Sequence, residues 1–174
     1  MKEDTLRSKL VYSGRLLKLR EVEVKLANGN TGKREICEHP GAVGIIAITP
    51  KKEIVLIRQY RKPAEKILLE IPAGLIEKGE KLQNAAKREL LEETGYLAGK
   101  LKKFSSVYMS PGYSTEVLHY FVATDLAKKE QCFEDDEDIE VKVTPLKKAL
   151  AMIKNGQIVD NKTIAGVLIA QWMI

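Results

Sequence analysis

Residues 81–94 place acidic side chains on one side of an expected helix. The segment contains no Gly or Pro and is rich in strong helix formers, and Gly95 follows it where a helix C-terminal glycine belongs. At about 100° per residue, Glu89 and Glu93 fall on one narrow stripe, with Glu92 beside them. Like charges four residues apart destabilise a helix by roughly a few tenths of a kcal/mol. The spacing therefore does not serve helix stability and indicates a cation-binding face.

A divalent cation would neutralise the mutually repelling carboxylates, which would then bind it. Mg²⁺ prefers carboxylate, water and phosphate oxygens, and it commonly bridges protein carboxylates to a phosphorylated substrate. Ala85 and Ala86 on the same side keep the surface low enough for ions and phosphate to approach, and Arg88 can pair with Glu92 and orient it. An isolated E-x-x-E-E is more often a solvated helix face of ion pairs than a metal site. The residues around it therefore decide between these two interpretations.

That surrounding pattern is G-x5-E-x7-R-E-U-x-E-E-x-G-U, where U is a bulky apolar residue. The chain carries its defining residues at the required spacing, with Tyr96 in place of an aliphatic residue at the last position. They are Gly74, Glu80, Arg88, Glu89, Leu90, Glu92, Glu93 and Gly95. The pattern is the Nudix box, and the chain resembles the Nudix hydrolases, which cleave nucleoside diphosphates linked to another moiety by using a divalent metal.

The resemblance implies roles for individual residues of the box. Glu89, Glu92 and Glu93 are expected to bind the metal, together with the backbone carbonyl of Ala73. Glu80 is expected to orient the box rather than to bind metal directly. The expected ion is Mg²⁺, with Mn²⁺ as a possible substitute.

A proline beyond the box points to the substrate class. Pro111 stands sixteen residues after Gly95, in a Ser-Pro-Gly context with Gly112, and this offset marks the ADP-ribose pyrophosphatases within the family. Flanking segments 39–43, 58–61 and 69–74 look like the same subfamily. The resemblance thus implies hydrolysis of ADP-ribose to AMP and ribose 5-phosphate, with Pro111 and Gly112 near the substrate.

Three alternatives to this function stay open. The substrate could be another nucleoside diphosphate sugar, NADH, a dinucleoside polyphosphate or an oxidised nucleotide, because the box itself reads only the diphosphate and the metal. The protein could also be a non-catalytic sensor of ADP-ribose-like metabolites. The third alternative is a nucleic-acid-binding protein, which would need a clustered basic face with exposed aromatic residues.

Residues outside the box are candidates for substrate binding. Arg58 or Arg61 could clamp phosphate oxygens with two hydrogen bonds, or simply decorate the end of a strand, and the sequence does not rank them. Glu70 could bind substrate hydroxyls or form a structural salt bridge.

Hydrolysis also needs a group that takes the proton of the attacking water. The resemblance places this base on a mobile acidic loop, here residues 131–138. Glu137 is the favoured residue, with Glu134 and Asp135 as alternatives. The catalytic candidates are therefore Glu137, Glu134 and the box residue Glu93.

Strands interspersed with helices are expected to position these residues. The continuous apolar run 41–48 is typical of a strand covered on both faces. Further expected strands are 54–60, 67–71, 107–108, 117–123 and 139–143, and further helices are 146–154 and 162–173. The pattern predicts an α/β fold. The resemblance specifies it as the Nudix fold, an α/β/α sandwich with a mixed sheet over residues 41–174.

The first forty residues predict a separate small antiparallel sheet. Apolar residues nearly alternate with charged ones between 17 and 26, Asn28-Gly29 supplies a hairpin turn, and a second strand spans 34–37. Such a sheet cannot stand alone in water. We expect residues 1–40 to pack on the main domain or on a partner subunit. The resemblance implies a homodimer with exchanged sheets.

The composition limits the classes of protein and of partner that the chain fits. The chain has 174 residues, 44% hydrophobic and 30% charged, which excludes disordered and collagen-like classes. The net charge of +5 suits a polyanionic ligand, but the basic residues are scattered and only 6% of residues are aromatic, so we expect no nucleic-acid partner. No apolar stretch approaches about 20 residues and no leader peptide is seen, so the expectation is a cytoplasmic protein without a membrane partner.

Overall fold

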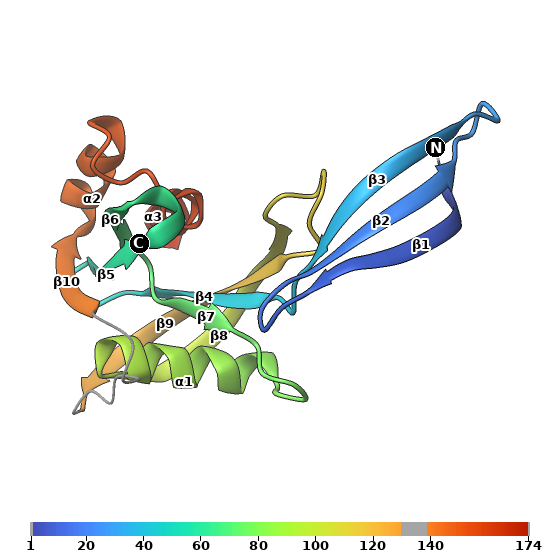
Figure 1. The fold of residues 1–174 in the computed structure, drawn as a ribbon. Helices are drawn as coiled ribbons and strands as arrows, with labels where there is room; N and C mark the ends of the chain where they lie inside the picture. Colours follow the sequence, from blue (N-terminus) through green and yellow to red (C-terminus); the bar gives the residue numbers. More distant parts are fainter. Residues whose placement is uncertain (1, 130–138, 174) are drawn as a thin grey trace. The chain divides into compact units, whose positions relative to one another are not determined.

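The computed structural model describes residues 2–129 and 139–173, drawn as a ribbon in Figure 1. The chain forms two compact units. The first contains Met1–Gly41 and Val107–Leu118, and the second contains Ala42–Ser106 and His119–Ile174.

The first unit is built on a three-stranded antiparallel sheet. Its strands are β1 (Asp4–Ser13), β2 (Lys18–Lys25) and β3 (Thr31–Glu38), in the order β1-β2-β3. The expected hairpin turn joins β2 to β3, where Gly29 has a φ of 88° and donates its N–H to the carbonyl of Leu26. Glycine adopts this left-handed backbone without steric cost.

Strand β1 has no counterpart in the sequence-based expectation. Its apolar residues do not alternate with polar ones, and its pairing with β2 shifts register between Thr5 and Arg7 and between Leu10 and Tyr12. Each irregularity interrupts the two-residue period by which a strand is recognised.

The segment Val107–Leu118 belongs to the first unit through contacts with the end of β3. Cys37 forms a parallel bridge with Ser114, and the Cys37 N–H donates a 2.7 Å hydrogen bond to the carbonyl of Tyr113. The turn after β8 therefore groups with the amino-terminal sheet.

The second unit contains two sheets and three α-helices. The mixed four-stranded sheet has the order β7-β4-β9-β8, and the antiparallel three-stranded sheet has the order β10-β5-β6. The strands are β4 (Ala42–Ala47), β5 (Glu53–Arg61), β6 (Lys66–Glu70), β7 (Ala73–Leu75), β8 (Tyr96–Tyr108), β9 (Val117–Lys128) and β10 (Ile139–Pro145). The helices are η1 (Lys62–Ala64), α1 (Leu82–Thr94), α2 (Leu146–Lys154) and α3 (Asn161–Met173).

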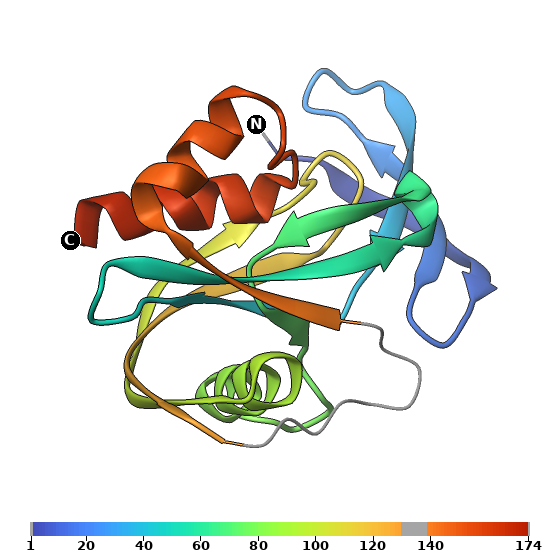
Figure 2. The same cartoon turned by 90° about the vertical axis from the view of Figure 1, so that its left-hand side faces the viewer.

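These elements form three layers. Helix α1 packs on β4 and β7, and α3 packs on β4 and β6. Figure 2 shows α1 on one side of the strands and α2 and α3 on the other. The predicted α/β/α arrangement with a mixed sheet is confirmed. Within the described ranges, no helix has the length and apolar character needed to cross a bilayer.

The core explains why β4 reads as a continuous apolar run. Val43 and Ile45 pack in a buried cluster with Ala85, Ala86 and Leu90 of α1. The opposite side of the strand faces α3, whose Gly166 lies so close that an added Cβ would be 3.2 Å from Ile71 and 3.4 Å from Ile46. Both sides of the strand are therefore covered.

Most expected elements of the second unit are present. Helix α1 ends at Gly95, whose φ is 69° and whose N–H donates to the carbonyl of Leu91, as the sequence predicts. Strand β8 is much longer than the expected 107–108, because its first part is rich in exposed polar residues that conceal the strand period. Strand β7 escaped prediction since it has only three residues.

Candidate active site

Helix α1 turns two carboxylates toward the sheet. Glu89 is 9% exposed and Glu93 is 2% exposed, and they share the buried side of the helix with Ala85, Ala86 and Leu90. Glutamate is almost never buried unless it is paired. This placement points to a local structure built around the carboxylates.

Arg88 holds three carboxylates of the box together. Its Nη1 atom donates to Glu89 Oε1 at 2.7 Å and to Glu92 Oε2 at 3.0 Å, so the expected Arg88–Glu92 pair is present. Its Nε and Nη2 atoms donate to the two oxygens of Glu80, each at 3.1 Å. The hydrogen bonds to Glu80 are the main reason that the pKa of Arg88 is raised, with further contributions from Glu89 and Glu92. One cation thus faces three anions, and a net negative charge remains.

Glu80 makes the contacts of an orienting residue. Besides both bonds from Arg88, it accepts a 3.1 Å hydrogen bond from the N–H of Glu77. Arg88 lowers the pKa of Glu80, and burial opposes this only in part. Arg88 also donates to the carbonyl of Leu75 at 3.0 Å, which ties α1 to β7.

Strand β7 lies directly against the glutamates. A Cβ added at Gly74 would be 2.1 Å from the carboxyl carbon of Glu89, so no larger residue fits without displacing that side chain. The N–H of Ala73 donates a 2.8 Å hydrogen bond to Glu93 Oε2. The four predicted metal-binding residues, Ala73, Glu89, Glu92 and Glu93, are therefore linked by short contacts through Arg88 and β7.

The donor chemistry of this region suits a hard divalent cation. Carboxylate and backbone carbonyl oxygens are the ligands that Mg²⁺ takes in proteins, and the excess negative charge favours it. Among residues 2–129 and 139–173, no three His, Cys, Asp or Glu side chains stand in a group ready to hold a metal. Arg88 donates to Glu89 and Glu92, and the N–H of Ala73 donates to Glu93. A bound cation would compete with these donors for the carboxylate oxygens.

A second charged group lies at the ends of β5 and β6. Arg61 donates two hydrogen bonds of 2.8 Å to the two oxygens of Glu70, whose side chain is 1% exposed. Burial would raise the pKa of Glu70, but Arg61 and Lys162 outweigh it and lower the pKa. The Glu70 hydrogen bonds raise the pKa of Arg61, and the charge of Glu93 contributes to the same shift. Glu70 thus forms a salt bridge, and its contact with substrate hydroxyls stays a prediction.

The structure separates the two candidate arginines. Arg58 forms a 2.7 Å ion pair with Glu140 of β10 in which both side chains are largely exposed. Arg61 lies three positions further along β5, and successive side chains of a strand alternate between faces. Arg61 therefore lies on the face of the sheet that carries Glu70, whereas Arg58 lies on the opposite face with Glu140.

Two of the remaining predicted residues belong to the first unit. Pro111 and Gly112 form an exposed turn in the first unit, where the N–H of Ser114 donates to the carbonyl of Ser110 at 2.9 Å. Glu134, Asp135 and Glu137 lie outside the described residues.

Sequence analysis missed a contribution from the start of α3. The Lys162 ammonium contacts both Glu70 and Asp160, and Asp160 accepts hydrogen bonds from the N–H and the hydroxyl of Thr163. Asp160 and Thr163 form a recognisable helix-capping pair. No local pattern reveals the Glu70–Lys162 contact, because its partners are far apart in the chain.

Comparisons with known proteins agree with this geometry. Residues 38–166 match the model of the NUDIX domain. The chain is 46% identical to a methanol dehydrogenase activator of Bacillus methanolicus over 167 residues, which cover 95% of this chain and 90% of that protein. It is 42% identical to an ADP-ribose pyrophosphatase of Bacillus subtilis (strain 168) over 165 residues, which cover 94% and 89%.

The fold also matches a solved structure. The crystal structure of an ADP compounds hydrolase superposes with a TM-score of 0.87 at 26% sequence identity, over 99% of this chain and 95% of that one. The expected fold is thereby confirmed. Proteins of this kind generally use a divalent metal. From its box residues, its three layers and these matches, the chain belongs to the Nudix family of hydrolases.

Proposed function

We propose that this protein hydrolyses ADP-ribose to AMP and ribose 5-phosphate in a Mg²⁺-dependent reaction. The observation that carries the proposal is the acidic face of α1, closed against Gly74 and lying near the charge of Arg61. A diphosphate needs both metal ions and cationic side chains around its oxygens. The similarity to an ADP-ribose pyrophosphatase and to an ADP compounds hydrolase supports the choice of substrate.

Glu89, Glu92, Glu93 and the carbonyl of Ala73 would hold the metal in this reaction. When bound, Mg²⁺ supplies charge neutralisation for the diphosphate and lowers the pKa of a bound water, and Mn²⁺ could substitute for it. Arg88 keeps Glu89 and Glu92 within reach of one another by donating a hydrogen bond to each. Ala73 does the same for Glu93 through its N–H.

Other residues of the chain bind the substrate and accept the proton. Arg61 would contact phosphate oxygens with the edge of the guanidinium that does not face Glu70, and Arg58 is the alternative. Pro111 and Gly112 would contact the nucleotide. The attacking water gives its oxygen to one phosphorus, the bond from that phosphorus to the bridging oxygen breaks, and the proton passes to Glu137, with Glu134 or Asp135 as alternatives.

We also propose that the protein acts as a homodimer in the cytoplasm, without a nucleic-acid partner. Strand β1 is exposed along its whole length and carries apolar residues, including Leu10, Val11 and Tyr12. Apolar surface on an edge strand favours association, and twofold dimers are the commonest assemblies. A cytoplasmic location suits a substrate derived from nucleotides.

Direct assay tests the proposal. The purified protein is incubated with ADP-ribose and MgCl₂, and the products are separated by chromatography. AMP and ribose 5-phosphate should form in equal amounts, and EDTA should stop their formation. A panel of GDP-mannose, NADH and diadenosine polyphosphate measures selectivity by kcat/KM. Absence of AMP over a range of Mg²⁺ and Mn²⁺ concentrations would refute the proposed reaction.

A second candidate follows from the similarity to a methanol dehydrogenase activator, which is 46% identical over nearly the whole chain. In this case the protein would stimulate an alcohol dehydrogenase. Assay of a methanol dehydrogenase with and without the protein distinguishes the two, because ADP-ribose hydrolysis requires no dehydrogenase.

A further inference from the structure

Four charged residues join β5, β6 and the start of α3 into one network, which we call the Glu70 network. Its members are Arg61, Glu70, Asp160 and Lys162, two cations and two anions. Glu70 stands at the centre with a 1% exposed side chain, while Lys162 and Asp160 are 14% and 17% exposed. The charges balance within the network, as buried ion pairs require.

Glu70 receives its two cations from different directions. Arg61 donates from Nε to Oε1 and from Nη2 to Oε2, each at 2.8 Å, which fixes the plane of the guanidinium. Lys162 contacts Oε2 from α3. Without Lys162, Oε2 would have Arg61 alone, and the carboxylate could rotate toward other donors.

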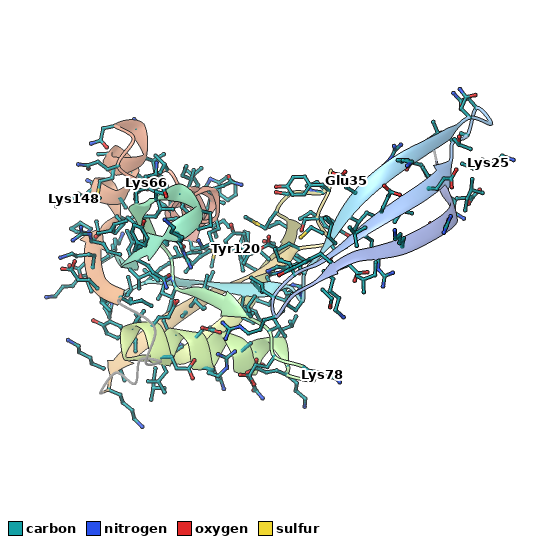
Figure 3. The ribbon with its side chains drawn as sticks, viewed as in Figure 1. Lys25, Glu35, Lys66, Lys78, Tyr120 and Lys148 are labelled. Carbon is teal, nitrogen blue, oxygen red and sulfur yellow. The ribbon has the colours of Figure 1, made fainter. Side chains whose placement is uncertain are left out.

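Lys162 itself is held by a rigid helix start. Asp160 lies 3.1 Å from its ammonium and accepts bonds from the N–H and the hydroxyl of Thr163, at 3.0 and 2.5 Å. Thr163 is fully buried and accepts a 2.8 Å bond from the N–H of Ile71. Tyr120 donates a 3.0 Å bond to the carbonyl of Lys162, and Figure 3 shows Tyr120 among the side chains of the second unit. The ammonium therefore occupies a defined position.

The guanidinium of Arg61 keeps one side for a ligand. Nε and Nη2 are bonded to Glu70, and Nη1 has no hydrogen-bond partner among the described residues. Arg61 is 37% exposed, so this edge can meet an anion from solvent. Arg61 binds Glu70, which lies three residues before Ala73, and the N–H of Ala73 donates to Glu93 on the acidic face of α1.

We propose that Lys162 is a positioning residue for diphosphate hydrolysis, holding Glu70 in the orientation in which it presents Arg61 to a phosphate oxygen of the substrate. This inference rests on the proposed function. It assigns to α3, far along the chain from the Nudix box, control over how well the diphosphate is bound.

The positioning role differs from a purely structural one in what it predicts. If Lys162 acts through Arg61, its removal weakens substrate binding, and the effect disappears once Arg61 no longer makes a two-bond contact. A structural contribution would act equally in both backgrounds. A double-mutant cycle separates the two cases.

The experiment compares Lys162→Met with wild type, alone and in an Arg61→Lys background, by steady-state kinetics with ADP-ribose. We expect Lys162→Met to raise KM about tenfold with kcat changed less than about threefold. In the Arg61→Lys background the same substitution should change KM less than about twofold. Lys162→Arg should restore KM to within about threefold of wild type, because it retains a cation facing Glu70.

Two further comparisons make the result decisive. Lys148→Met, on the exposed outer side of α2 (Figure 3), is the matched control and should leave KM unchanged. Lys162→Gln, a polar uncharged replacement, serves the same cycle if Lys162→Met does not fold. Failure of both to fold would make Lys162 a structural residue and overturn the inference.

Equal KM changes in both backgrounds, or no change in either, would also overturn it while the proposed function stands. Lack of ADP-ribose turnover by the wild type would instead refute the proposed function itself. The outcomes of the two proposals are therefore separate.

Discussion

Gly74 and Glu89 approach each other so closely that a single methyl group on residue 74 would lie 2.1 Å from the Glu89 carboxyl carbon. This contact joins β7 to the acidic face of α1. It gives the first position of the box a physical role, because only glycine leaves room for the carboxylate.

Gly74→Ala should therefore disturb the site strongly. The methyl group must displace Glu89 or shift β7, at a cost of about 1–3 kcal/mol for overpacking. We expect kcat/KM for ADP-ribose to fall at least about 100-fold, a loss of about 2.7 kcal/mol in transition-state stabilisation. Gly32→Ala is the matched control, since its Cβ would lie 3.3 Å from the flexible end of Arg34 and 3.8 Å from Val24, an ordinary van der Waals contact. Wild-type kinetics in Gly74→Ala would contradict the steric argument.

Glu93→Gln should abolish most activity while the protein stays folded. The amide retains the shape of the side chain and can still accept the Ala73 hydrogen bond, but it loses the negative charge. We expect kcat to fall at least about 100-fold and Mg²⁺ binding, measured by calorimetry, to weaken. Glu65→Gln, a replacement in an exposed pair with Lys62, provides the control. Unchanged Mg²⁺ binding would exclude Glu93 from the metal site.

Arg61 and Arg58 should differ in their effect on substrate binding. We expect Arg61→Ala to raise KM for ADP-ribose by at least about tenfold and Arg58→Ala by less than about threefold. The reason is position, because Arg61 binds Glu70 just before β7, whose Ala73 contacts Glu93, whereas Arg58 pairs with Glu140 at the surface. Steady-state kinetics on both variants tests this ranking, and the reverse order would show that Arg58 binds the phosphates.

The Glu70 network should make stability depend on pH in the acid range. The folded pKa of Glu70 is lowered below its ordinary value of 4.5. Its stabilising contribution is therefore fully present above that value and is lost as the pH falls through the lower folded pKa. The melting temperature should drop below about pH 4.5, where the unfolded chain binds the proton more readily.

Glu70→Gln tests the assignment of this pH dependence. At pH 7 the variant should lose about 3–5 kcal/mol, because Arg61 and Lys162 are left without their buried anion. Its melting temperature should then vary less than that of wild type between pH 3.5 and 5. If the melting temperatures of wild type and Glu70→Gln fall equally with decreasing pH, the pH dependence comes from other carboxylates.

Association through β1 can be disrupted by charge. Leu10 and Tyr12 are exposed apolar residues close together on the edge strand β1. Replacing both by Glu should shift the proposed dimer to monomer in light scattering at micromolar concentration. A wild-type protein that is already monomeric there would rule out the dimer.

Local patterns predicted the second unit well and the first unit less well. The period and end of α1, the apolar run of β4 and the Asn28-Gly29 turn are set by neighbouring residues, so they are readable from sequence. Strand β1 is not, since its irregular register hides the alternation.

The residues of the candidate site also fall into those that the sequence predicts and those that it does not. The carboxylates of the box stand on one helix, so their spacing alone places them together. The Glu70–Lys162 contact, and the choice between Arg58 and Arg61, depend on how distant strands and helices pack. No local spacing contains that information.

The bond from the Ile71 N–H to the Thr163 hydroxyl also has a consequence for biosynthesis. Ile71 lies just before Ala73 and Gly74, yet its anchor is made late, when residues 160–163 have left the ribosome. A nascent chain that already carries the whole box would still lack the hydrogen bond that anchors Ile71, the residue shortly before β7. Enzymatic competence should therefore wait for residues 160–163 rather than appear when the box emerges.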